Sequence, residues 1–139
     1  MNEFVVNERL IDEAVSVAGK AMSRAYAPYS GFHMGAAVVT EKGVIIPGSL
    51  VENVSLGLAM CAERIALFSS VSQDAGKPKL LVLMSRRTDG KLTFPCGACL
   101  QVAMELGGPE LEIVACDTDG NKDKDVLANL ASRLPRKTS

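Results

Sequence analysis

Two short cysteine motifs constrain this chain more than any other feature of its sequence. The first is Cys-Ala-Glu-Arg at residues 61–64, and the second is Pro-Cys-Gly-Ala-Cys at residues 95–99. Thiolates are good zinc ligands, and a catalytic zinc takes three protein ligands and leaves its fourth position to water. We therefore expect Cys61, Cys96 and Cys99 to hold one Zn2+ ion with an open position. The fold must then bring both motifs to one point.

The residues that follow Cys61 suggest what such a site does. Glu63 is expected to stay off the metal, collect a proton from the metal-bound water and deliver it to a substrate nitrogen. A Cys or His two residues before such a Glu, with Pro-Cys-x-x-Cys later, is the pattern of zinc deaminases. Arg64 is expected to hydrogen-bond a coordinated sulfur and offset the charge of the thiolates. A surface carboxylate and a solvated arginine remain the alternatives.

Two further residues have metal-binding side chains but do not fit this spacing. His33 is the only histidine, and we interpret it as a loop residue without a metal role. Cys116 ends an apolar run and is expected to be a buried free thiol. If either served as a fourth ligand, the chain would be a zinc-stabilised binding module. That alternative leaves Glu63 and Arg64 without a role.

Composition limits the classes of partner and the cellular compartment that we expect for this protein. The 139 residues suit one domain over residues 1–139, and 15 basic against 16 acidic residues give a net charge of -1. Such a balance gives no long-range attraction to polynucleotides or anionic membranes, so we expect neither as a partner. We find no bilayer-spanning apolar run and no basic-then-apolar secretory start. With four cysteines, reduced thiols and a cytoplasmic protein are expected.

The hydrophobic pattern predicts helices alternating with strands. Residues 8–25 have apolar side chains at helical spacing, with Asn7 as the N-cap. A break at Pro28 and Gly31 precedes a β-hairpin of residues 34–40 and 44–47. Further helices are expected from about 59–61 to 72, at about 96–106 and at about 126–134, with strands at 79–85 and 111–116.

This order of elements predicts an α/β fold: a three-layer α/β/α sandwich around a mixed sheet of about five strands. Strand–helix–strand crossovers after residue 44 imply parallel pairing in the later half of the sheet. Both cysteine motifs fall at helix starts, where free N–H groups and the helix dipole stabilise thiolates.

The chain resembles the small cytidine deaminase family, homotetrameric in its short form, over nearly its whole length. The matching segments are residues 25–32, 35–37, 51–53, both cysteine motifs and Gln101. The resemblance implies a cytidine deaminase-like fold with one zinc per subunit. It implies that zinc-bound hydroxide attacks C4 of cytidine or deoxycytidine, releasing ammonia and forming uridine or deoxyuridine. It also implies a role in pyrimidine salvage and sites completed by neighbouring subunits of a homotetramer.

The resemblance assigns further residues to the binding of a small-molecule nucleoside. It implies that Phe32 packs on the pyrimidine, Glu52 binds a sugar hydroxyl and the backbone near Ala62 meets the base edge. Phe32 lies where a loop becomes strand, so a core position is its alternative. Stacking on an aromatic face is worth about 1–3 kcal/mol.

Several positions depart from the family pattern. Leu50 stands where typical members have an Asn that holds the ribose, and the loss of one such hydrogen bond costs about 1–3 kcal/mol. Leu56 and Leu100 replace a usual Tyr and Arg, and the C-terminal aromatic is missing. These changes favour an alternative substrate: an N4-substituted cytidine, a blasticidin-type nucleoside antibiotic or another amino-heterocycle. A polynucleotide deaminase is disfavoured because the chain has no basic-aromatic strip.

Overall fold

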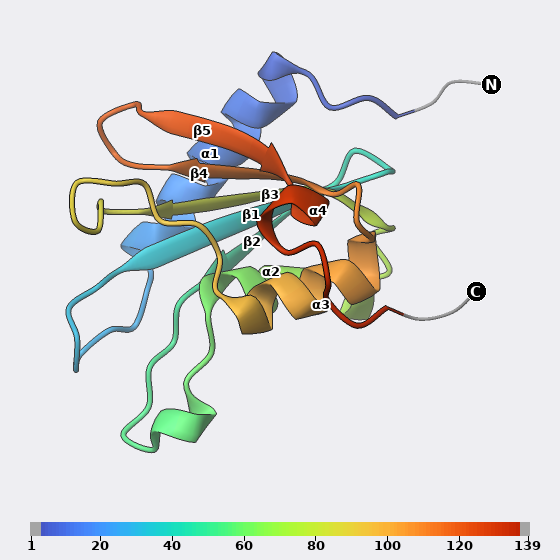
Figure 1. The fold of residues 1–139 in the computed structure, drawn as a ribbon. Coiled ribbons are helices and arrows are strands. Elements are labelled where there is room, and N and C mark those ends of the chain that lie inside the picture. The colour runs from blue at the N-terminus through green and yellow to red at the C-terminus, as the bar shows by residue number, and fades with distance from the viewer. Residues whose placement is uncertain (1–3, 137–139) are drawn as a thin grey trace.

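The computed structural model describes residues 4–136, in which one five-stranded sheet is flanked by helices (Figure 1). The expectation about a secretory start falls partly on residues 1–3, outside the described residues. The elements, in chain order, are α1 (Glu8–Ser23), β1 (Met34–Thr40), β2 (Ile45–Ser49), a 3-10 turn η1 (Leu56–Leu58), α2 (Ala62–Ser72), β3 (Pro78–Ser85), α3 (Gly97–Gly107), β4 (Glu112–Cys116), β5 (Lys122–Val126) and α4 (Leu127–Leu130).

The strands are ordered β2-β1-β3-β4-β5 across the sheet. Strand β1 is antiparallel to both β2 and β3, and β4 is antiparallel to β5. Only β3 and β4 pair in parallel, and α3 makes the crossover between them. The mixed sheet is therefore confirmed, but the parallel pairing expected for its later half is limited to one pair.

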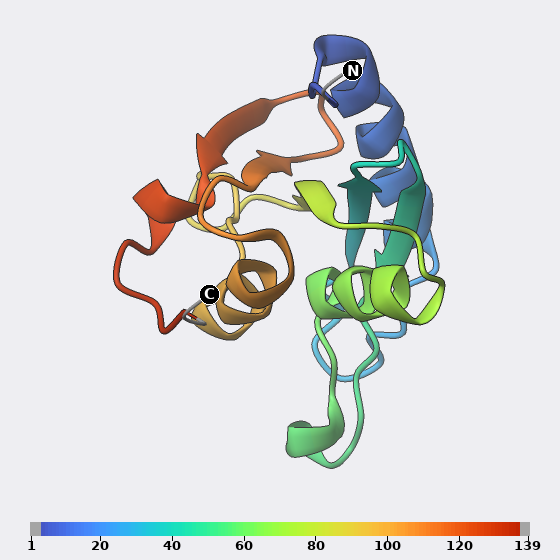
Figure 2. The same cartoon turned by 90° about the vertical axis from the view of Figure 1, so that its right-hand side faces the viewer.

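Helices cover both faces of the sheet, as the α/β/α prediction requires (Figures 1 and 2). Helix α1 packs on one face through Ile11, Ala14 and Ala18, which meet β-strand residues such as Val82 in one apolar cluster. Asn7 caps this helix, because its side chain accepts a hydrogen bond from the N–H of Leu10 at 2.9 Å.

Helices α2 and α3 lie side by side on the opposite face (Figure 2). They share a second apolar cluster in which Ala66, Leu67 and Ala103 pack against sheet residues such as Leu81 and Ile113. Both helices run in the same direction, because the strands that precede them, β2 and β3, are each antiparallel to β1. Their N-termini therefore meet at the same end of the sheet.

The prediction was wrong at the C-terminal end. Residues 122–126 form an edge strand, β5, and α4 has only four residues where a helix over 126–134 was expected. Lys122, Asp123 and Lys124 are exposed, so the strand has no alternating apolar face to reveal it. Instead, backbone pairing with β4 and an ion pair of 3.1 Å between Lys124 and Glu112 hold it to the sheet.

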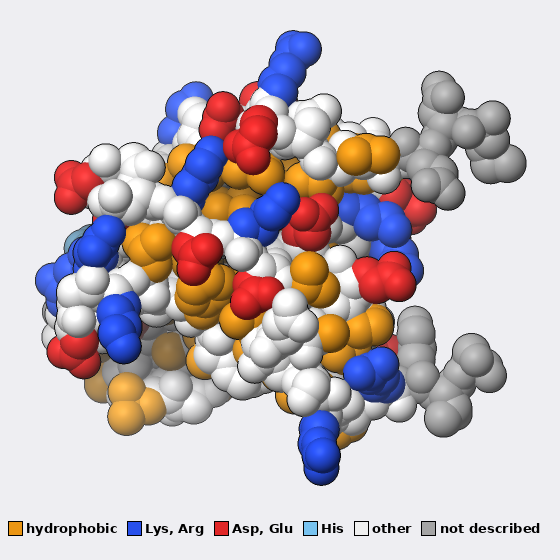
Figure 3. Space-filling model, turned by 45° about the horizontal axis from the view of Figure 1, so that its top comes forward, with side chains coloured by type: hydrophobic (Ala, Val, Ile, Leu, Met, Phe, Trp, Pro, Cys, Tyr) orange, Lys and Arg blue, Asp and Glu red, His pale blue; other side chains and the backbone are white. Residues whose placement is uncertain are grey.

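The surface matches the near-neutral composition. On the face shown in Figure 3, acidic and basic side chains are interspersed over the molecule. Lys122 illustrates the pattern, because its Nζ lies 3.3 Å from Glu8 and 3.1 Å from Asp12. Among residues 4–136, we find no helix with the length and apolar character needed to cross a membrane.

Candidate metal centre and active site

The cysteine motifs meet where α2 and α3 begin. Cys61 is the N-cap of α2, Cys96 is the N-cap of α3, and Cys99 lies in the first turn of α3. Because the two helices start at the same end of the sheet, the three Sγ atoms lie within 4.8 Å of one another. The fold thus brings together the three thiols that the sequence motifs singled out.

This thiol set fits a zinc ion. Zinc–sulfur bonds of about 2.3 Å in a tetrahedral site place neighbouring sulfurs roughly 3.8 Å apart, within the separation found here. Within the described residues, neither of the two alternative ligands joins the cluster. His33 is exposed, and Cys116 is buried in the α1 face of the core, where its Sγ lies 3.5 Å from the carbonyl oxygen of Leu83.

Hydrogen bonds among the thiols and Arg64 shift the pKa values of two of the cysteines. A hydrogen bond from Cys99 and another from Arg64 lower the pKa of Cys61 to about 5, against the opposing effect of burial. The hydrogen bond between the two thiols raises the pKa of Cys99. Arg64 Nη2 donates to Cys61 Sγ at 3.4 Å, while its buried Nε has no hydrogen-bond partner. Arg64 therefore hydrogen-bonds one sulfur of the thiol cluster, the Cys61 Sγ.

Glu63 faces the same centre from the second position of α2. Its side chain is buried, with only 2% of the residue exposed, and its Oε1 atom has no hydrogen-bond partner. Burial and, more weakly, the charge of Cys61 raise the pKa of this carboxyl to about 7. A buried carboxyl oxygen without a partner is costly unless a ligand satisfies it. Its position beside the thiol cluster indicates that this oxygen is available to a water or a ligand bound there.

The loop that carries Phe32 is fastened to Glu52. Glu52 Oε1 accepts hydrogen bonds from the N–H groups of Tyr29 and Ser30, and Oε2 accepts one from the Ser30 hydroxyl at 2.6 Å. The Ser30 hydroxyl in turn accepts from the N–H of Phe32. A carboxylate has about four acceptor sites, so Glu52 retains about one for a further donor.

The other candidate substrate contacts differ in their surroundings. Ala62 is fully buried in the first turn of α2, where a helix leaves backbone N–H groups without partners. Leu50 is half-buried and packs on the α2–α3 cluster, so it presents no polar group. Leu100 is part of the same core, and Leu56 is 85% exposed on the protruding 50–61 loop (Figure 1).

Sequence reasoning missed two residues at this end of the sheet. Ser30 links Glu52 to Phe32, and the guanidinium of Arg86 lies 4.7 Å from the centre of the Phe32 ring. Both contacts join segments far apart in the chain, so neither leaves a local pattern. The sequence signal was limited to a serine in a turn and an arginine after a strand.

A mixed α/β sheet with three clustered thiols at two helix N-termini and a buried, unpaired carboxyl beside them defines a class: the zinc-dependent deaminase-like proteins. The model of the cytidine and deoxycytidylate deaminase zinc-binding region matches residues 8–115. The chain belongs to this family.

Individual relatives agree with this assignment. A probable cytidine deaminase of Dictyostelium discoideum is 38% identical over 114 residues, which cover 82% of this chain and 76% of the relative. A cytidine deaminase of Mycobacterium tuberculosis is 43% identical over 96 residues, which cover 69% of this chain and 71% of the relative. A crystal structure of cytidine deaminase from Burkholderia pseudomallei superposes with a TM-score of 0.83 at 36% identity, covering 94% of this chain and 100% of that one.

Proposed function

We propose that this chain catalyses the zinc-dependent hydrolytic deamination of cytidine and deoxycytidine to the corresponding uracil nucleosides. Water adds at C4 of the cytosine ring, the exocyclic amino group leaves as ammonia, and a carbonyl forms at C4. The observation that carries the proposal is the buried Glu63 Oε1, which has no partner and adjoins a cluster of three thiols.

Each residue of the site has a role in this proposal. Cys61, Cys96 and Cys99 hold the zinc ion, which when bound supplies the Lewis acidity that activates water at neutral pH. Glu63 takes a proton from the attacking water and transfers it to the ring nitrogen; it then carries a second proton, from the hydroxyl formed at C4, to the departing amino group. Arg64 holds Cys61 in its orientation through the 3.4 Å hydrogen bond and offsets the thiolate charge.

The substrate is oriented by three groups in this proposal. One face of Phe32 stacks on the pyrimidine, the free acceptor site of Glu52 binds a sugar hydroxyl, and the backbone at Ala62 contacts the base edge. Leu50 packs against the core and offers no hydrogen bond to the sugar. That observation favours the second candidate, deamination of an N4-substituted cytidine, a blasticidin-type nucleoside or another amino-heterocycle.

We further propose that the protein is a homotetramer with sites at subunit interfaces, acting in cytoplasmic pyrimidine salvage as one domain of residues 1–139. Two apolar surfaces support self-association. The tip of the 50–61 loop exposes Val54, Leu56 and Leu58. A groove of about 450 Å³ between α2 and α3 is lined mainly by Phe68, Val71, Val102 and Leu106. Light scattering that gives the mass of a single chain would contradict this assembly.

An ammonia-release screen with the zinc-loaded protein tests the proposed activity. Cytidine, deoxycytidine, cytosine, N4-modified cytidines and other amino-heterocycles are compared in the unchanged protein and in Glu63→Gln. We expect release from a cytosine nucleoside and a loss of several orders of magnitude in Glu63→Gln, with its zinc content unchanged. Equal turnover by the two proteins would refute the proton-transfer role of Glu63.

A further inference from the structure

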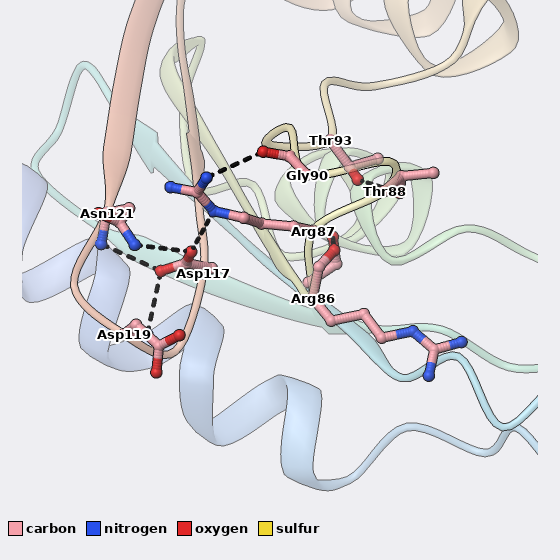
Figure 4. A network of polar contacts seen from close by, with 9 residues as sticks. Arg86, Arg87, Thr88, Gly90, Thr93, Asp117, Asp119 and Asn121 are labelled. Atoms are coloured by element: carbon pink, nitrogen blue, oxygen red, sulfur yellow. Dashed lines mark hydrogen bonds and ion pairs between the residues drawn. The ribbon is translucent and has the colours of Figure 1, made fainter.

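Arg86 and Arg87 follow β3 directly and point to opposite sides (Figure 4). Arg87 Nε donates to Oδ2 of Asp117 at 3.0 Å, and its Nη1 donates to the carbonyl of Gly90 at 2.9 Å. Asp117 is buried and accepts three further hydrogen bonds from the turn between β4 and β5. The charge of Arg87 is therefore neutralised within the fold.

The same contacts fix the backbone that carries Arg86. Thr88 and Lys91 exchange two backbone hydrogen bonds, at 2.8 and 3.0 Å, and the hydroxyls of Thr88 and Thr93 lie 2.8 Å apart (Figure 4). The segment after β3 is thus a closed turn fastened by Arg87 to the neighbouring hairpin. Arg86 stands at the start of this turn, so its side chain projects from a held backbone.

Arg86 differs from Arg87 because its charge has no ion-pair partner within the part of the chain that the structure describes. Its guanidinium lies over the Phe32 ring at 4.7 Å from the ring centre, within the range of a cation–π interaction. Among residues 4–136 it makes no ion pair, although the side chain is exposed. A guanidinium held over a ring by its charge makes no hydrogen bond to that ring, so its N–H donors remain available to a ligand.

Arg86 lies at the end of the sheet that holds the thiol centre. Met34, the first residue of β1, pairs with Ser85, the last residue of β3. Phe32, just before β1, and Arg86, just after β3, therefore lie at the same edge of the sheet. The chain then runs from Arg86 to the start of α3, where Cys96 lies. The Arg86 guanidinium therefore adjoins the ring that stacks on the base in the proposed function, and Leu50 offers the sugar no hydrogen bond beside the one assigned to Glu52.

We propose that Arg86 binds an anionic group on the substrate, a phosphate or a carboxylate carried at the sugar end of a cytosine nucleoside. A planar fork of donors matches both anions bidentately, and the contact with Phe32 restrains the guanidinium in advance. The inference rests on the proposed deamination, because it names the substrate class of that same site.

The test measures a ratio of specificities in the zinc-loaded protein. kcat/KM is determined for cytidine, for cytidine 5′-monophosphate and for the 5′-carboxylate analogue of cytidine, with unchanged protein and with Arg86→Gln. We expect the unchanged protein to prefer at least one anionic probe, and Arg86→Gln to lower the anionic-to-neutral ratio by about tenfold or more. The preferred probe shows whether phosphate or carboxylate is the natural group.

Arg9→Gln is the matched control, because Arg9 is an exposed arginine on α1 that pairs with Glu13 at 3.3 Å. It should leave the ratio unchanged. An unaltered ratio in Arg86→Gln overturns the proposal, including the case in which all three substrates weaken equally because Arg86 only supports Phe32. A lower mass of Arg86→Gln in light scattering, with an unaltered ratio, would instead assign Arg86 to a contact with a second copy.

Calorimetric binding of cytidine 5′-monophosphate and cytidine gives a readout that needs no turnover. Weaker binding of the monophosphate alone in Arg86→Gln supports the anion site even where no ammonia is released. The 5′-carboxylate analogue is measured in the same way, and equal binding of all three compounds by the two proteins overturns the anion site. Failure of every cytosine compound to release ammonia, with the binding difference intact, refutes the proposed deamination and leaves the anion site standing.

Discussion

Gly48→Ala is expected to disable the site without altering any residue in it. Gly48 lies in β2 beneath α2, the helix that carries Cys61 at its N-cap and Glu63 in its first turn. A Cβ atom at this position would lie 2.6 Å from the backbone N of Ala66, where ordinary contact begins at 3.4 Å. Because the obstructing atoms are helix backbone, α2 must retreat by at least about 0.8 Å.

The size of that shift sets the expected losses. Overpacking of this kind costs about 1–3 kcal/mol of unfolding free energy. A displacement of roughly 1 Å in catalytic groups costs about 10²-fold in rate. We therefore expect Gly48→Ala to fold with reduced stability in urea, to bind zinc more weakly and to release ammonia about a hundredfold more slowly.

Gly35→Ala is the matched control. A Cβ at Gly35 would lie 2.7 Å from the Cα of Met22, so it displaces α1 on the opposite face of the sheet. No candidate site residue lies on α1, so this variant should lose similar stability while its turnover per folded molecule stays within a few-fold. If Gly48→Ala is destabilised but retains full turnover and zinc, or if both variants lose turnover equally, the position of α2 does not control the site.

Three other predictions follow from single contacts. Cys99→Ser should lose zinc by emission spectroscopy, whereas Cys116→Ser, on the other face of the sheet, should keep it; equal zinc in both variants would refute the ligand assignment. The hydrogen bond from Asn121, with that from Arg87, lowers the pKa of Asp117 to about 2 from 3.8, so the folded state binds this proton less tightly than the unfolded state. Asp117 therefore stabilises the fold above about pH 4, and this contribution disappears as the pH falls through 2. In Asp117→Asn the midpoint of urea unfolding should depend less on pH between about 4 and 2, and an unchanged pH dependence would contradict the pairing. Leu50→Asn should raise kcat/KM for cytidine by about tenfold if Leu50 weakens sugar binding, and no gain would exclude Leu50 as the cause.

The thiol centre could be predicted from the sequence because its ligands are local features of two helix starts. Cys61 and Cys96 are N-caps, and Cys99 is one turn into its helix, so each motif fixes its own geometry. The strand order then brings the two helix starts together. The α/β architecture was predictable from local patterns too, since α1 has apolar residues at helical spacing and β3 contains a short unbroken apolar run and begins just after Gly76 and Lys77.

The missed features depend on contacts between distant segments. Strand β5 has the sequence Lys-Asp-Lys-Asp-Val and is held by backbone pairing at a sheet edge, which composition does not reveal. The links from Glu52 to Ser30 and from Asp117 to Arg87 join loops that are 22 and 30 residues apart. Only the folded backbone decides which of several polar loop residues meet, so such pairs have no signature in one sequence.

X-ray absorption at the zinc edge, with zinc quantified per chain, tests the central claim most directly. The account predicts one zinc per chain, bound by three sulfurs at about 2.3 Å and by one oxygen at about 2.0 Å. Four sulfurs, a fourth protein ligand in place of the oxygen, or a stoichiometry near zero in protein purified with zinc present would contradict it.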